Sequence, residues 1–231
     1  MVYCFKMRRG NNNLMCNKIT YLIVSTEDDV RLVKGGIGTY LGLLVQAFSK
    51  YRPNINLIWL TESPSNRFFV ERRFGCRVFY IPKSNLRHKI CKACERICKI
   101  FANSPKNKVF VEAPDWEGLL SDLYSKISYK NVVKITRLHS VLALTKQGRV
   151  SFSKEEKQQI KREHEQLLHT DIISAPTQYV YDFTYHLSKG ALRNIPHFII
   201  PNFINGSFEI KGKNQGKKCV VYSIRKLEKI L

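Results

Sequence analysis

A glycine-rich segment near the start of the chain could bind an anion. It reads KGGIGTY over residues 34–40 and leads into an amphipathic stretch. Glycines let a ligand approach the backbone, and the free amides of a first helical turn attract phosphate or carboxylate. The spacing is not that of a dinucleotide fingerprint, because Leu41 stands where the third glycine belongs, and no Walker A lysine follows. Both an anion cradle and a tight turn that needs glycine only for space stay open.

Polar side chains also follow two later apolar runs. Glu112 and Asp115 come at the end of the run at 108–113, and Arg137 and His139 at the end of the run at 132–138. Glu112 is a candidate ligand for a substrate, whereas Asp115 is better explained as the N-cap of a helix that begins at Trp116. An imidazole at 139 could orient a bound group through a hydrogen bond. A structural histidine is the alternative.

Two patterns suggest a metal site, and neither has the spacing that one requires. The C-x2-C-x3-C pattern of Cys91, Cys94 and Cys98 places the three thiols on the apolar face of a helix, without a fourth ligand at zinc spacing. We therefore expect the cysteines to pack in the core. His164 and His169 are five residues apart, so the H-E-x-x-H spacing fails as well. No metal is predicted.

Residues 83–108 form a basic amphipathic segment. Eight lysines and arginines oppose Glu95 alone, around an apolar stripe of helical spacing. We expect the stripe to face the core and the basic face to meet anionic lipid or glycan. An ordinary solvated helix face is the alternative. The residues expected on this face are Lys89, Lys92, Arg96 and Lys99.

Short apolar runs alternate with helical stretches along most of the chain. Strands are predicted at 19–25, 56–61, 78–81, 108–113, 132–138, 171–175 and 197–201, and helices at 37–50, 116–127, 154–169 and 178–187. Strands that alternate with helices imply right-handed crossovers and a parallel sheet. The runs are apolar throughout, as in strands buried on both faces. The fold class is therefore a doubly wound, Rossmann-like α/β sheet.

Composition limits the possible functions. The 231 residues carry 39 lysines and arginines against 18 acidic residues, a net charge of +21, which favours anionic partners. Hydrophobic residues make up 44%, enough for a core, yet no apolar run is long enough to cross a bilayer. No secretory segment is evident and the seven cysteines are irregularly spaced, so we expect a cytoplasmic protein with reduced thiols.

Several motifs together resemble retaining glycosyltransferases of the two-domain GT-B class, similar to glycogen synthase and to glycosyltransferase family 4. The matching segments are KGGIGTY at 34–40, the acidic positions after 108–113, RLHS at 137–140, DIISAP at 171–176 and IIPNFIN at 199–205. The resemblance implies a nucleotide-sugar donor, a glycan or lipid-linked acceptor and no cofactor. It implies a catalytic role for His139. It further implies substrate contacts from Gly35, Gly36, Gly38, Thr39, Glu112, Arg137 and Asn202.

The two ends of the chain depart from this pattern. Residues 1–18 read as a basic extension, 19–205 as the Rossmann-like domain and 206–218 as a linker. Residues 219–231 resemble the truncated start of the donor-binding domain, with Arg225 and Lys229 as weak counterparts of its diphosphate ligands. The resemblance thus implies the acceptor-binding half of an enzyme that is inactive alone. A separately encoded second domain is then an expected partner.

We expect this half-enzyme to build a cell-surface glycan and to lie in the cytoplasm, peripherally at the inner face of the cytoplasmic membrane. The alternative is a basic α/β protein that binds nucleic acid or an anionic surface without catalysis. Against nucleic acid, the sequence contains no recognition-helix motif, RNP-like aromatic set or zinc-finger spacing.

Overall fold

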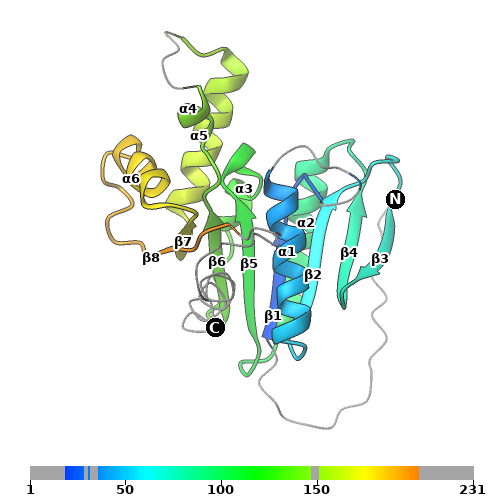
Figure 1. Cartoon of the computed structure of the whole chain (residues 1–231). Coiled ribbons are helices and arrows are strands. Elements are labelled where there is room, and N and C mark those ends of the chain that lie inside the picture. Colours follow the sequence, from blue (N-terminus) through cyan, green and yellow to red (C-terminus); the bar gives the residue numbers. More distant parts are fainter. Residues whose placement is uncertain (1–18, 29–30, 32–35, 147–150, 203–231) are drawn as a thin grey trace, which may run out of the picture.

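One eight-stranded sheet organises the molecule (Figure 1). The structure is a computed structural model that describes residues 19–28, 31, 36–146 and 151–202. The strand order is β3-β4-β2-β1-β5-β6-β7-β8, and every neighbouring pair is parallel except β3 with β4. The strands are β1 Ile19–Val24, β2 Asn56–Glu62, β3 Phe69–Arg73, β4 Cys76–Ile81, β5 Lys108–Pro114, β6 Val132–Arg137, β7 Ile172–Ala175 and β8 His197–Ile199. The predicted doubly wound α/β fold is confirmed.

Helices cover both faces of the sheet. Helix α1, Gly36–Tyr51, packs Tyr40, Leu44 and Phe48 on one face, across β1 and β2 (Figure 1). The opposite face is covered by α2 Leu86–Phe101, α3 Ser121–Tyr124, α5 Lys154–Leu168 and α6 Gln178–Leu187. This arrangement follows from right-handed crossovers that run in opposite directions along the sheet, from β1 to β2 through α1 and from β4 towards β8 through the later helices. Because these strands are parallel, their carboxyl ends all lie at one edge of the sheet.

Two predicted elements differ from those in the structure. Strand β3 was not predicted, because its charged residues hide the pattern of a buried strand. It is an antiparallel edge strand whose side chains alternate between half-buried and exposed. The helix predicted at 116–127 is broken into a 3-10 turn, Trp116–Gly118, and the short α3. Glu117 and Gly118 have positive φ angles of 67° and 55°, which a continuous helix cannot contain.

The break at Gly118 lets the chain lie directly against α5. A Cβ on Gly118 would come within 2.4 Å of the Arg162 carbonyl carbon, so only glycine fits there. The capping box of α5, in which Ser153 and Glu156 bond each other's backbone amides, fixes the start of that helix. A further short helix, α4 Leu142–Thr145, was not predicted and lies between β6 and α5. None of the helices described is both long and apolar enough to cross a bilayer.

Candidate functional site

The carboxyl edge of the sheet brings together most of the predicted site residues. Glu112 and Arg137 lie on the neighbouring strands β5 and β6, and Asn202 follows β8. Both strand side chains point to the α1 face, because they have the same alternation as Phe110 and Ile135 on their strands. Ligands of open α/β sheets bind at this edge. Glu112, Arg137 and Asn202 therefore lie at one edge of the sheet, and their role as a site stays a prediction.

Glu112 is buried and held by two tyrosines. The hydroxyl of Tyr21 on β1 donates to Glu112 Oε2, and that of Tyr40 on α1 donates to Oε1 at 3.3 Å. Burial raises the pKa of Glu112, while the tyrosine hydroxyls and Arg137 act in the opposite direction. With only 2% of its surface exposed, Glu112 fits a role in positioning Tyr40, and the substrate contact that the resemblance implied stays a prediction.

Arg137 is fully buried and ties the end of the sheet together. Its guanidinium donates to Ser174 Oγ at 3.1 Å, to the Ile200 carbonyl at 2.6 Å and to Asn202 Oδ1 at 2.8 Å. The guanidinium carbon also lies 4.5 Å from the ring centroid of Tyr40, a cation–π distance. Arg137 therefore holds Asn202 in position. This fits a positioning role better than the predicted contact with substrate.

The glycine motif is already occupied on one side by a carboxylate. The Gly38 amide donates to Glu27 Oε2 at 3.2 Å, where the N-terminus of α1 favours negative charge. A Cβ at Gly38 would lie 2.4 Å from the Asp28 carbonyl oxygen, so this glycine is also required for space. Gly36 and Thr39 are exposed, and Gly35 lies outside the described residues. The tight-turn interpretation is thus supported at Gly38.

His139 follows β6 and contacts α1. Its ring lies edge-on to Tyr40, with centroids 5.4 Å apart, and its backbone amide donates to Asp115 Oδ1 at 3.0 Å. Burial, with a smaller effect of the Arg137 charge, lowers the pKa of His139 to about 3. The imidazole is therefore neutral at pH 7. It can exchange hydrogen bonds with a hydroxyl group but contributes no charge.

Asp115 holds the His139 segment instead of capping a helix. Asp115 stands at the N-cap position of the 3-10 turn that begins at Trp116, as predicted, but its side chain makes no cap hydrogen bond there. The carboxyl group is fully buried, and burial raises its pKa to about 7 in spite of backbone hydrogen bonds from His139, Ser140 and Trp116. Strand β6 lies beside β5, so the chain that follows β6 at His139 reaches the Asp115 carboxylate at the end of β5.

Helix α2 has the orientation predicted for its two faces. Cys94 and Cys98 are buried in the core, which confirms that they pack as small hydrophobic residues. Burial raises the pKa of the Cys91 thiol to about 11, and its Sγ donates to the Leu119 carbonyl. Of the basic residues, Lys92, Arg96 and Lys99 are exposed, while the half-buried Lys89 donates to Ser84 Oγ at 2.9 Å.

Several predicted features lie outside the described residues. These are Arg225, Lys229, the basic extension at 1–18, the linker at 206–218 and the segment at 219–231. In the described part, the sequence analysis missed Tyr21, Tyr40, Glu27 and Ser174. Tyr21 and Tyr40 look like ordinary core residues, and only their place opposite Glu112 shows their polar role.

Comparisons with known proteins identify the fold only. No family model and no curated protein sequence matches the chain. A solved structure of sucrose-phosphate synthase from Thermosynechococcus elongatus matches with a TM-score of 0.51 and 10% identity, covering 90% of this chain and 96% of that one. A UDP-glucosyltransferase from Polygonum tinctorium matches with a TM-score of 0.48 and 9% identity, and the match spans 89% of this chain and 56% of that one. The first likeness shows a shared Rossmann-like α/β fold.

The steric role of Gly38 can be tested by urea unfolding. Gly38→Ala should lower the free energy of unfolding by about 1 to 3 kcal/mol, because the new methyl group meets backbone. Gly36→Ala is the matched control, since its Cβ would meet nothing within 4 Å. It should leave stability unchanged or slightly higher. Equal effects of the two substitutions would contradict the close packing of Gly38.

The buried carboxyl of Asp115 predicts a pH-dependent stability. Its folded pKa of about 7 exceeds the ordinary value of 3.8, so between these pH values the folded protein binds more protons than the unfolded chain. This group's contribution to the free energy of unfolding therefore falls as pH rises, by up to about 1.4 kcal/mol per pH unit. Asp115→Asn removes the titration, whereas Glu112 and Glu163 titrate in both proteins. Urea unfolding of the unmodified protein and of Asp115→Asn from pH 4 to 8 should show a difference in the free energy of unfolding that changes with pH. A difference that stays constant with pH would contradict the raised pKa of Asp115.

Proposed function

We propose that the chain is the acceptor-side domain of a nucleotide-sugar-dependent, retaining glycosyltransferase of the GT-B class. The observation that carries the proposal is the grouping of His139, Tyr40 and Asn202 at the carboxyl edge of a Rossmann-like sheet. The fold shared with sucrose-phosphate synthase supports it. Residues of the sequence motifs that resemble those of glycosyltransferases lie at the same edge.

The groups at this edge favour the binding of uncharged sugar over the binding of diphosphate. Arg137 donates to Ser174, Ile200 and Asn202, and the Gly38 amide donates to Glu27. Neither is available for a phosphate without breaking an internal hydrogen bond. The diphosphate of the donor would then be held by a second domain, which we propose as a partner of this one. No metal is part of the proposal.

His139 is the proposed catalytic residue, through orientation and not through charge. A neutral imidazole beside Tyr40 could hydrogen-bond a hydroxyl of the donor sugar and hold it in line for transfer. Its lowered pKa keeps it in this neutral form over the whole physiological range. Asp115 would support the role by holding the His139 backbone, and Tyr40 by packing against the ring.

The acceptor is proposed to be a growing glycan or a lipid-linked sugar at the cytoplasmic membrane. The exposed basic residues of α2, Lys92, Arg96 and Lys99, would face anionic head groups, with Lys89 beside them. Such a face would keep the domain close to a membrane-bound acceptor. This surface and the strand edge are separate parts of the molecule.

Sugar transfer by source-cell extracts tests the function. The chain would be added to an extract that supplies acceptor and any separate donor-binding domain, with a radiolabelled nucleotide sugar. We expect transfer into the glycan or lipid fraction, and His139→Ala should lower the rate at least about tenfold, a barrier change of about 1.4 kcal/mol.

Leu168→Ala, at an exposed position on α5, is the control and should keep full activity. Transfer that does not depend on the added chain, or that His139→Ala leaves unchanged, would contradict the proposal. Circular dichroism of each variant would show that the fold is retained.

A further inference from the structure

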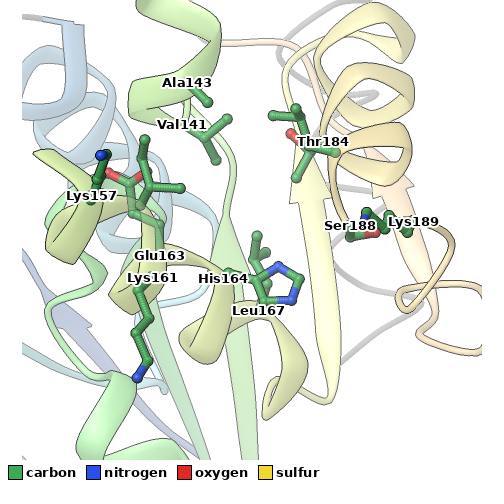
Figure 2. A pocket seen from close by; sticks show the side chains of 12 residues that line it. Val141, Ala143, Lys157, Lys161, Glu163, His164, Leu167, Thr184, Ser188 and Lys189 are labelled. Atoms are coloured by element: carbon green, nitrogen blue, oxygen red, sulfur yellow. The ribbon is translucent and has the colours of Figure 1, made fainter. Parts of the chain in front are cut away.

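A groove lies between α4, α5 and α6, and its lining contains none of the residues of the candidate site. Its volume is about 400 Å³. Figure 2 shows Val141 and Ala143 on one side, His164 and Leu167 on the floor, and Thr184 and Ser188 on the facing side. Neither the glycine motif nor His139 or Asn202 lines it. The groove is on the sheet face opposite α1, so it is distinct from the proposed sugar-transfer edge.

The polar side chains of Thr184, Ser188 and Glu163 in the walls are already hydrogen-bonded, and the imidazole of His164 lies on the floor. Thr184 Oγ1 donates to the Val180 carbonyl at 2.9 Å and Ser188 Oγ to the Tyr185 carbonyl at 2.7 Å. The Glu163 carboxylate accepts from the Glu117 and Leu142 amides at 3.1 and 2.9 Å. What remains towards the hollow is mostly apolar, because Ile160, Leu167 and Leu187 complete the lining. Such walls suit an apolar occupant better than water.

The rim of the groove is cationic. Lys157, Lys161 and Lys189 line it and are exposed, and the structure pairs none of them with a carboxylate of the described residues. The neighbouring acidic side chains have other partners, since Glu156 contacts Lys146 and Glu165 lies 3.9 Å from His169. In Figure 2 the Lys161 side chain extends outward, away from the apolar floor. A flexible lysine there could reach an anionic head group outside the hollow.

We propose that this groove binds a single-chain lipid with a phosphate head group. The apolar floor would take the hydrocarbon chain, and the three lysines would attract the phosphate. A volume of about 400 Å³ lies within the usual range for small-molecule sites, about 300 to 1,000 Å³. The inference does not depend on the proposed sugar transfer, because it rests on other residues.

The groove also adjoins the segment that carries His139. Val141 lines it, and the Leu142 amide is held by Glu163, whose other oxygen holds the turn at Glu117. A chain bound on this floor would therefore touch the connection between His139 and α5.

Calorimetric titration with alkyl phosphates below their micelle concentrations tests the proposal. Decyl phosphate should bind saturably, and octyl phosphate more weakly by about fourfold per methylene removed, the equivalent of about 0.8 kcal/mol each. Inorganic phosphate should show no saturable binding at this site. Decyl maltoside, with the same chain and no charge, should bind more weakly than decyl phosphate. Equal affinities of the two decyl compounds would overturn the role of the phosphate.

Two matched pairs of variants locate the site. Leu187→Asp places a charge in the groove wall and should weaken decyl phosphate at least about tenfold, whereas Leu168→Asp, on α5 but outside the lining, should not. Both leucines are partly exposed, at 48% and 37%, so neither change empties the core. Lys157→Glu with Lys161→Glu should weaken binding more than Lys92→Glu with Lys99→Glu on α2. Equal effects within either pair would overturn the proposal, with thermal unfolding as the check on folding.

Discussion

The buried guanidinium of Arg137 is the interaction on which the candidate site depends. It joins β6 to β7 through Ser174, holds the segment after β8 through Ile200 and Asn202, and lies on the ring of Tyr40. A buried charge needs hydrogen-bond partners such as these three, because desolvation without them costs several kcal/mol. The position of Asn202 therefore follows from the need to satisfy Arg137. Tyr40, which contacts Arg137, also donates to Glu112 and so connects α1 to β5.

In the described residues, groups that often bind anions in folds of this kind are bonded within the protein itself. The N-terminus of α1 usually attracts a ligand phosphate in folds of this kind, but here Glu27 bonds the Gly38 amide. The neutral His139 and the engaged Arg137 leave an edge with little available positive charge in the part that the structure describes. Among the described residues, exposed lysines and arginines are instead found on α2, and three lysines line the rim of the α5–α6 groove. The proposed division between uncharged substrate at the edge and anionic lipid on the helical face follows from this distribution.

Much of the fold was predictable from hydrophobic pattern alone. The seven parallel strands and the helix at 178–187 were found because each is continuously apolar or strongly periodic. Strand β3 and the broken helix after Asp115 were missed, since an exposed edge strand has no apolar run and a positive φ at Glu117 leaves no mark in the sequence.

The site was predictable in its location but not in its contacts. Residues that follow neighbouring parallel strands must meet at one edge, which placed Glu112, Arg137 and His139 together. Which of them touches a ligand depends on burial and on partners distant in sequence, such as Tyr21, 91 residues before Glu112. The structure shows that Glu112 and Arg137 are buried and bonded to neighbouring residues, whereas their contact with a substrate stays a prediction.

The most direct test is a nuclear magnetic resonance titration of the chain with nucleotide sugars, using UDP-glucose, GDP-mannose and ADP-glucose in turn. The account predicts that at least one shifts the amide signals of Thr39, His139 and Asn202, with a dissociation constant no tighter than about 1 mM, or about 4 kcal/mol of binding energy. The signals of Leu168 and Leu187 should not move. Absence of shifts at the strand edge with all three sugars, or shifts centred on α5 and α6, would contradict the account.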